Sequence, residues 1–262
     1  MHTLLAAVFG VIVGSFLNVC IFRIPRGESV VFPASHCPLC RKPIAPLDNI
    51  PVISFLILKG RCRQCAAKIS WQYPLVEILG ACLFVLFYYF FGVTVKGVLY
   101  LLFSLALLVE TFIDLRQQII PDVITLPGIV IGLVASVLFP NFHGEAVWWM
   151  GLLKSLTGML IGGGFFYAAG VIAEWILKKE AIGGGDIKLL AMIGALLGWP
   201  GVFWTIFASS LLGSAVGLYL RVKNGQEKIP FGPFIALGAF SYLFFGQRIV
   251  LWYVHSIGIY RT

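Results

Sequence analysis

Long apolar stretches separated by short polar segments form the dominant pattern of this chain. Several of them reach the roughly 17–25 residues that an α-helix needs to cross a bilayer. They break at proline, glycine or charged residues, as helical segments usually do. The pattern predicts an all-α polytopic membrane protein with about eight transmembrane helices, at Thr3–Phe22, Pro74–Phe91, Gly97–Ile113, Val123–Phe139, Val147–Leu177, Ile187–Leu197, Gly201–Leu220 and Ile229–Val250.

The short stretch Ile187–Leu197 needs a separate argument, because as a helix it would measure only about 17 Å against a hydrocarbon core about 30 Å thick. Basic residues stand at both ends of the region that contains it: Lys188 at its start, and Arg221, Lys223 and Lys228 after it. If both ends face the cytoplasm, the chain crosses the membrane twice and turns at Trp199–Gly201. We therefore predict a helical hairpin here, with both termini of the chain outside.

Composition supports a membrane protein, since 60% of the 262 residues are hydrophobic and only 11% are charged, whereas about a quarter of a soluble domain is charged. A net charge of +8 would suggest nucleic acid in a soluble protein, but lysine and arginine also gather in the cytoplasmic loops of membrane proteins. The predicted topology leaves only Lys96, Lys154, Arg248 and Arg261 at or near the outer face, among 19 basic residues. We therefore expect membrane lipid as a partner and no nucleic acid.

The segment Arg23–Tyr73 differs from the rest of the chain, because it contains prolines, charges and four cysteines but no apolar run long enough to span. It predicts a small cytoplasmic insert between the first and second transmembrane helices. The expected domain organisation is a first transmembrane helix at 1–22, the insert at 23–73 and a membrane-embedded domain at 74–262.

The four cysteines of the insert form two Cys-x-x-Cys pairs, Cys37 with Cys40 and Cys62 with Cys65. Each such turn aims two thiolates at one point, and two turns together suit the tetrahedral coordination of Zn²⁺. A segment of about 50 residues buries little core, so a bound metal would supply the missing folding energy. Disulfides are disfavoured on the reducing cytoplasmic side. The alternatives are two redox pairs without metal, or thiols without a role.

Three of the acidic residues lie where the predicted helices meet the cytoplasmic face: Asp114 ends the third span, Asp122 begins the fourth and Asp186 precedes the sixth. Ionisable groups at membrane depth are costly and usually functional. Two carboxyls held close together cannot both ionise easily, so one keeps a proton while the other acts as a base. Such a pair can hydrolyse an amide with water and without a covalent intermediate.

Three glycines, Gly183–Gly185, directly precede Asp186, and residues without Cβ let an extended substrate backbone approach the acid closely. Other interpretations stay open: a glycine hinge with capping acids, a proton- or ion-coupled transporter that uses intramembrane acids, or an assembly scaffold held by zinc. Two more acids fall within predicted helices. Glu110 lies one turn before Asp114, and Glu77 is either structural or faces the insert.

Taken together, four motifs resemble the bacterial type IV prepilin peptidase family, also called leader peptidase/N-methyltransferase. In chain order they read GSFLNVCIFRIPRGESVVFPASHCPLC, LDNIPVISFLILKGRCRQCAAKISWQYPLVE, FIDLRQQIIPDVITLP and GGGDIKLLAMIGALLGWPG. The resemblance implies a GxGD-type aspartic protease whose glycines fall on Gly183 and Gly185 and whose catalytic acids fall on Asp114 and Asp186. Asp122 matches a common acid of the family outside the catalytic pair, and we take it and Lys188 as supporting residues.

Enzymes of this family remove the short basic leader from prepilins and pseudopilins of type IV pili and type II secretion systems, at the cytoplasmic face of the bacterial inner membrane. In these substrates an apolar helix follows the leader and can lie in the bilayer beside the enzyme. Many members then methylate the new N-terminus with S-adenosylmethionine, and those members usually carry the tetracysteine insert. The resemblance therefore implies prepilin substrates, structural zinc and a methyl donor whose binding residues the sequence does not identify. The oligomeric state stays open.

Overall fold

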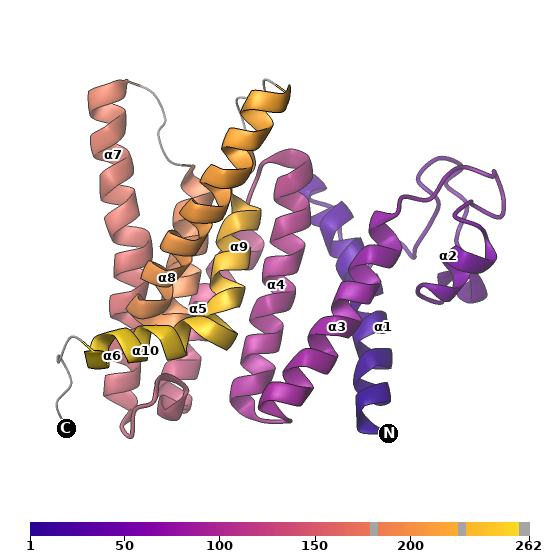
Figure 1. The fold of residues 1–262 in the computed structure, drawn as a ribbon. Helices are drawn as coiled ribbons and strands as arrows, with labels where there is room; N and C mark the ends of the chain where they lie inside the picture. Colours follow the sequence, from indigo (N-terminus) through magenta and orange to yellow (C-terminus); the bar gives the residue numbers. More distant parts are fainter. Residues whose placement is uncertain (179–182, 225–228, 257–262) are drawn as a thin grey trace. The chain divides into compact units, whose positions relative to one another are not determined.

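The computed structural model describes residues 1–178, 183–224 and 229–256, and these residues form helices and loops without a β-strand (Figure 1). The predicted all-α fold is therefore confirmed over the described ranges, while Lys228 and Arg261 of the predicted topology lie outside them. The α-helices are α1 (His2–Arg23), α2 (Ile53–Ile57), α3 (Gln72–Phe91), α4 (Val95–Gln117), α5 (Asp122–Leu138), α6 (Trp148–Met159), α7 (Phe166–Leu177), α8 (Gly184–Asn224), α9 (Gly232–Ser241) and α10 (Gln247–Ser256).

Five helical segments within the described ranges are long and apolar enough to cross a membrane: His2–Arg26, Gln72–Phe91, Val95–Gln117, Trp148–Ile176 and Gly184–Lys223. Two shorter apolar segments are Asp122–Leu138 and Gly232–Gly246. The multi-pass membrane character is confirmed, and the number of eight crossings stays a prediction.

Helix α8 contains the turn that the charge pattern predicted. Helical geometry fails at Gly198, where φ is 71° and ψ is 177°, a conformation that is essentially restricted to glycine. The chain reverses direction there, so α8 has a first arm, residues 184–197, and a second arm, residues 199–224 (Figure 1). Pro200 follows the break, near the start of a helical segment, where its missing N–H is tolerated. The turn therefore lies one residue before the predicted Trp199–Gly201.

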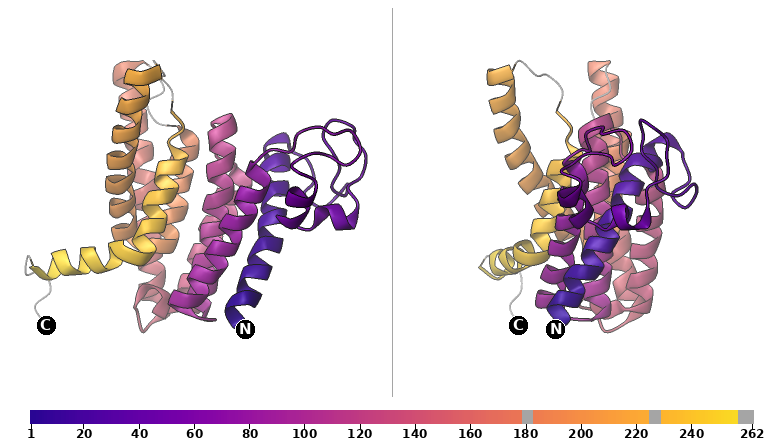
Figure 2. Two further views of the ribbon diagram at one scale, coloured as in Figure 1. Left: turned by 45° about the vertical axis from the view of Figure 1, so that its right-hand side comes forward. Right: turned by 90° about the vertical axis from the view of Figure 1, so that its right-hand side faces the viewer.

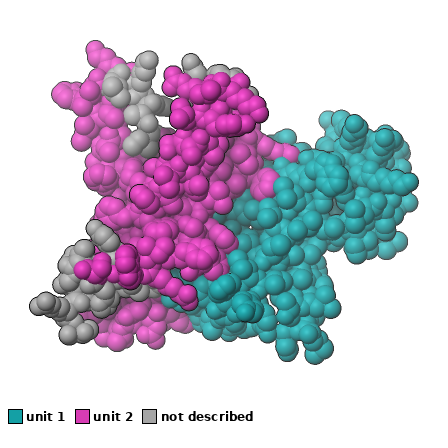
Figure 3. All heavy atoms as spheres, viewed as in Figure 1, with its two compact units in different colours: residues 1–109 teal, residues 110–262 magenta. Residues whose placement is uncertain are grey.

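Internal contacts divide the chain into two compact units, residues 1–109 and 110–262, with the division inside α4 (Figure 3). The three segments expected from the sequence remain a prediction, because this grouping does not test their boundaries.

In the N-terminal unit, α1 and α3 pack against each other, with the backbone of Gly10 against that of Ala81. The insert leaves α1 through Arg23, whose side chain is buried. Its guanidinium donates hydrogen bonds to the carbonyl oxygens of Ser29 (2.8 Å) and Pro33 (2.6 Å). These bonds fix the direction in which the insert leaves the helix.

In the C-terminal unit, the first arm of α8 forms the core, and its Leu189, Ile193 and Ala195 are buried. Helix α5 packs against this arm, and so does α6, where Ser155 donates a hydrogen bond to the carbonyl oxygen of Ala195 (2.6 Å). Helix α9 packs against α8 as well. Asp186 lies at the start of this arm. The packing of the other helices around the buried arm therefore fixes where Asp186 lies.

The last predicted span, Ile229–Val250, ends earlier than expected. Helix α9 begins only at Gly232 and continues into a π-helical turn, Tyr242–Gly246. The chain then bends into α10, which runs across the direction of α9 (Figures 1 and 2). Helices often bend at π-helical turns, and the continuous apolar sequence gave no sign of this one.

Candidate active site and metal centre

Asp114 lies in the last turn of α4 and is only 5% exposed. Its Oδ2 accepts a hydrogen bond from the backbone N–H of Gly232 at 2.9 Å. Gly232 is the first residue of α9, and the first N–H groups of a helix have no partner within the helix and attract negative charge. The carboxyl of Asp114 therefore meets the N-terminus of α9.

Gly232 permits this contact because it has no side chain. A Cβ at this position would lie 2.7 Å from Oδ2 of Asp114 and 3.1 Å from its Cγ. Both values are shorter than ordinary van der Waals separations of about 3.5–4.0 Å. Glycine at position 232 thus leaves the room that the carboxyl occupies.

Asp186 lies in the first turn of α8 and lines a cavity of about 280 Å³. Phe231, the residue before Gly232, lines the same cavity, as does Gly183. A Cβ on Gly183 would lie 3.1 Å from Oδ2 of Asp186, so this glycine too leaves space beside a carboxyl. The segment 231–232 thus touches both Asp114 and the cavity of Asp186.

The structure brings the two predicted catalytic acids to the same short segment, since Gly232 contacts Asp114 and the preceding Phe231 lines the cavity of Asp186. One acid is contributed by the end of α4 and the other by the start of α8. The cavity beside Asp186 is wide enough for several water molecules, each of which takes up about 30 Å³ in the liquid. Asp186 lines this space directly, and Asp114 is joined to it through the segment 231–232.

The supporting residues hold the same end of the unit together. Lys188 Nζ contacts both carboxylate oxygens of Asp122 at 2.7 Å, which joins the start of α5 to the start of α8. The side chains are 42% and 54% exposed, so the pair contributes at most about 1 kcal/mol. Gly185 lies against Ile120, and a Cβ there would come within 2.9 Å of the Cβ of that residue. The placement of Asp114, Asp122 and Asp186 at one face of the membrane stays a prediction.

Glu110 occupies the turn of α4 before Asp114 and is 2% exposed. Within the described part of the chain neither of its carboxyl oxygens has a hydrogen-bond partner. It shares a helix face with Asp114 by the four-residue spacing. The sequence placed Glu110 in a helix without indicating this burial.

The four cysteines of the insert come together as predicted. Their Sγ atoms all lie within 4.8 Å of one another, and those of Cys37 and Cys65 are 3.9 Å apart. A tetrahedral Zn²⁺ with Zn–S bonds of about 2.3 Å would hold sulfurs roughly 3.8 Å apart. The donor set therefore fits zinc. The backbone N–H of Cys40 holds the pKa of Cys37 at about 7, below the usual value of a thiol, which favours the thiolate that binds metal.

The two Cys-x-x-Cys turns repeat one backbone pattern. The N–H of Cys37 donates to the carbonyl of Lys42 (3.0 Å), and the N–H of Cys62 donates to that of Ala67 (2.8 Å). The residue after each second cysteine, Arg41 or Ala66, has a φ of 56°. Residues other than glycine adopt this left-handed conformation at a cost of about 1–2 kcal/mol. Both turns hold that strain in order to aim their sulfurs at one centre.

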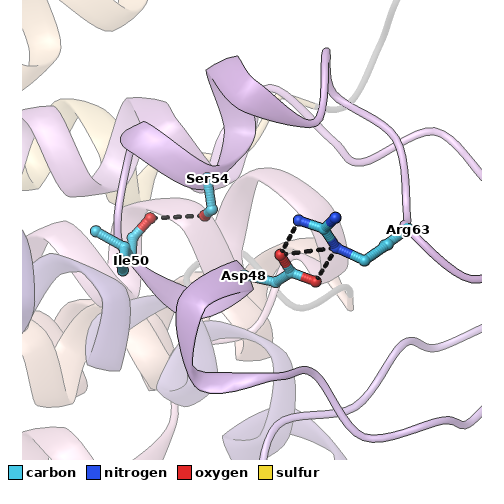
Figure 4. Close-up of polar contacts among 4 residues, drawn as sticks. All are labelled: Asp48, Ile50, Ser54 and Arg63. Atoms are coloured by element: carbon cyan, nitrogen blue, oxygen red, sulfur yellow. Dashed lines mark hydrogen bonds and ion pairs between the residues drawn. The ribbon is translucent and has the colours of Figure 1, made fainter.

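Two carboxylates anchor the insert. Asp48 binds Arg63, which lies between the second pair of cysteines, through contacts of 2.6–3.0 Å (Figure 4). The hydrogen bonds from Arg63 hold the pKa of Asp48 below its usual value. Glu77 on α3 is buried and its Oε2 accepts the N–H of Val52 at 2.7 Å, just before α2. Glu77 therefore faces the insert, and its contact there is itself structural, so the two interpretations do not exclude each other.

Comparison with known proteins places the chain in a family. Residues 8–91 match the Bacterial Peptidase A24 N-terminal domain, and residues 101–218 match the Type IV leader peptidase family. The "Prepilin leader peptidase/N-methyltransferase" of Pseudomonas putida is 35% identical over 274 residues, which cover 94% of this chain and 91% of the relative. The chain belongs to the type IV leader peptidase family.

Other relatives of this leader peptidase agree over similar lengths. The protein of the same name from Pseudomonas aeruginosa is 36% identical, with 95% of this chain and 92% of the relative covered. The "Type 4 prepilin-like proteins leader peptide-processing enzyme" of Escherichia coli is 37% identical, with 92% and 93% covered. No solved structure matches the chain. The identification as a peptidase, drawn from four motifs, is confirmed, and the double name of the relatives matches the expected second activity.

The sequence did not identify Gly232 as part of the candidate site. Its contribution is a backbone N–H and an absent side chain, and neither depends on a reactive residue type. The sequence did contain one signal, the run Phe231–Gly232–Pro233. Proline favours the first turn of a helix, and a glycine before it leaves the N–H groups of that helix end uncovered by a side chain.

Proposed function

We propose that this leader peptidase cleaves type IV prepilins or pseudopilins by aspartic, GxGD-type hydrolysis with Asp114 and Asp186 as the catalytic residues. The observation that carries the proposal is the meeting of the two acids around the start of α9, where Gly232 binds Asp114 and Phe231 borders the cavity of Asp186. Elements far apart along the chain supply Asp114, Asp186 and the segment 231–232. A glycine hinge with capping acids would not require these elements to meet.

The roles of the two acids follow from their contacts. Asp114 is assigned as the base, because its Oδ2 accepts the Gly232 N–H, a hydrogen bond that a carboxylate makes more strongly than a neutral acid. It takes a proton from a water molecule, which attacks the carbonyl carbon of the scissile amide. Asp186 starts protonated and donates its proton to the carbonyl oxygen, which gives a gem-diol intermediate. When the C–N bond breaks, Asp114 passes the proton that it took from water to the leaving nitrogen, and a hydroxyl of the diol returns a proton to Asp186 as the new carboxyl group forms. No bond forms between the enzyme and the substrate.

The glycines before Asp186 serve the approach of the substrate. Gly183 and Gly184 are exposed, and nothing lies within 4 Å of the position that a Cβ on Gly184 would take. A substrate backbone in extended form can therefore come close to the acid from this side. Lys188 and Asp122 hold the start of α8 in place for that encounter.

The cysteine cluster has a separate role in the proposal. Cys37, Cys40, Cys62 and Cys65 bind a structural Zn²⁺, which holds the two strained turns of the insert together. S-adenosylmethionine supplies the methyl group for the new N-terminus, and we assign no residue to its binding. The site lies at the cytoplasmic face of the inner membrane, as the distribution of basic residues predicts.

The test is incubation of the purified protein with a prepilin and measurement of the product mass. Loss of the leader indicates the peptidase, and a further gain of one methyl group indicates both activities. Asp114→Asn and Asp186→Asn should abolish cleavage while the protein still inserts and folds. A transporter would instead show solute flux with the substrate intact, and a zinc-held scaffold would tolerate loss of both aspartates.

A second test separates the metal from the acids. Cys62→Ser should release zinc, as measured by metal content, and should reduce methylation more than cleavage. Equal loss of both activities would contradict the placement of methylation and cleavage in separate regions, and unchanged zinc content would contradict the assignment of zinc to the four cysteines.

A further inference from the structure

Helix α2 of the insert is tied to the side of α3, a helix long and apolar enough to cross the membrane. The backbone N–H of Val52, directly before α2, donates to Oε2 of Glu77 at 2.7 Å. Glu77 lies about 7.5 Å along α3 from its first residue, Gln72, at 1.5 Å per residue. The start of α2 therefore lies beside the second turn of α3 and not beyond the end of that helix.

The packing of α1 on α3 gives the depth of this point. Gly14 lies against Glu77, because a Cβ on Gly14 would come within 2.7 Å of the Cα of Glu77. From Gly14 to the end of α1 at Arg23 the helix rises about 13.5 Å. The whole of α1 measures about 33 Å, close to the thickness of about 30 Å of a hydrocarbon core, so its basic end lies near the membrane boundary. Val52 is thus bound on the membrane side of that boundary.

A ring contact holds the rest of α2 at the beginning of α3. The ring of Phe55 packs on that of Trp71, with the two centroids 4.8 Å apart. Trp71 directly precedes α3 and is exposed, and tryptophan is enriched where a membrane meets water. Helix α2 therefore lies between the level of Trp71 and that of Glu77. Figures 1 and 2 show it in this place, beside α1 and α3.

The outward side of α2 is apolar. Ile53, Leu56 and Ile57 are each more than half exposed, and their spacing of three and four residues puts them on one side of the helix, opposite the buried Phe55. We call these three residues the α2 face. Exposed basic residues follow it in the chain: Lys59, Arg61, Arg63 and Lys68. An apolar helix face beside basic residues is typical of helices that lie in the surface of a membrane, where anionic headgroups attract lysine and arginine.

The depth of α2 decides what covers its face. The described residues of the chain leave Ile53, Leu56 and Ile57 exposed, so the cover comes from outside the chain. At the level between Trp71 and Glu77 the surroundings of α1 and α3 are lipid, and a soluble protein reaches that level only by displacing lipid. Lipid is therefore the occupant that the position of α2 provides.

We propose that the α2 face is inserted into the boundary between the headgroups and the acyl chains of the membrane that α1 and α3 cross. The insert is thereby seated in the membrane surface, whereas the sequence predicted a cytoplasmic segment. Lipid contact through α2 adds a third attachment of the cysteine cluster to the membrane-spanning helices, beside the hydrogen bonds of Arg23 and Glu77. The proposal goes beyond the peptidase function and does not depend on it.

The test uses the full-length protein in nanodiscs of anionic phospholipid, with a photo-crosslinking amino acid at position 53 or at position 64. Ile53 belongs to the α2 face, whereas Gln64 is exposed between two cysteines and next to Arg63. We expect lipid adducts at position 53, identified by mass, and about tenfold fewer at position 64, because charged groups such as Arg63 are costly among acyl chains. Adducts of position 53 with a second copy of the chain, or equal lipid yields at the two positions, would overturn the proposal.

Substitution of Ile57 gives a second measurement. Ile57→Glu places a charge in the α2 face and should reduce the lipid adducts at position 53 by about tenfold, since a carboxylate avoids the acyl chains. Ile57→Phe keeps the face apolar and should leave the yield within about twofold. Fewer adducts in Ile57→Glu with its zinc content retained support the proposal, and an unchanged yield contradicts it. The comparison of positions 53 and 64 needs neither variant and no cleavage assay, so it decides the proposal even if Ile57→Glu loses zinc or the protein cleaves no prepilin.

Discussion

Replacing Gly232 with alanine tests how the N-terminus of α9 supports Asp114. The new Cβ would lie 2.7, 3.1 and 3.3 Å from Oδ2, Cγ and Cβ of Asp114. With ordinary contacts at about 3.5–4.0 Å, the carboxyl has to withdraw by roughly 1 Å. The 2.9 Å hydrogen bond from the Gly232 N–H would then be lost or severely weakened.

The size of the effect follows from the hydrogen bond. A bond to a charged group contributes about 1.5–3 kcal/mol, and about 1.4 kcal/mol corresponds to a factor of ten in rate. We therefore expect Gly232→Ala to lower kcat for leader removal by about 10- to 150-fold. The variant should remain folded, because alanine has a higher helix propensity than glycine and position 232 lies in a helix.

The assay is single-turnover cleavage of a prepilin in detergent or proteoliposomes, with thermal unfolding measured in parallel. Gly217→Ala is the matched control, since its Cβ would meet only Cδ1 of Ile229 at 3.4 Å, an atom that can move aside. The control should cleave within twofold of the unmodified enzyme. Full activity of Gly232→Ala would refute the reasoning, because it would show that the position of Asp114 does not depend on this contact.

Three further predictions concern stability. Ala66→Gly should relieve the left-handed strain at φ 56° and stabilise the insert by about 1 kcal/mol. The expected measurement is slower loss of zinc to a chelator, and faster loss would contradict the prediction. Glu110→Leu should raise the midpoint of thermal unfolding, because both buried carboxyl oxygens lack a hydrogen-bond partner in the described structure. Such a buried polar group lowers the folding stability by about 1–3 kcal/mol. A lowered midpoint would contradict the prediction, because it would mean that Glu110 has a stabilising partner. Glu77→Leu should speed proteolysis of the insert by leaving the Val52 N–H unpaired, whereas Glu77→Gln, which can still accept that bond, should not.

Much of the fold could be predicted because hydrophobic length and charge act directly on helices in a membrane. The break at Gly198 followed from the short run before it and from basic residues at both ends. The bend at Tyr242–Gly246 could not be predicted, because a π-helical turn changes the hydrogen-bonding pattern of the backbone without changing the apolar character of the side chains. The same holds for the end of α9, which the apolar run continues past.

The residues of the candidate site also fall into two groups, those that the sequence could predict and those that it could not. Asp114, Asp186 and the four cysteines stood out because carboxylates and thiols are rare and costly in such a chain. Gly232 did not, since it acts through its backbone, 118 residues from Asp114 in sequence. The burial of Glu110 and the contact of Glu77 with Val52 also required the packed structure, because both acids lie on helices whose facing partners the sequence does not name.

The cleavage rates of Asp114→Asn, Asp186→Asn and the double variant, each measured on folded protein, test the central claim most directly. Groups that act as one unit are strongly non-additive, so we expect each single change to abolish leader removal as completely as both together. Measurable cleavage by either single variant, or two partial losses that multiply in the double variant, would contradict catalysis by a shared carboxyl pair.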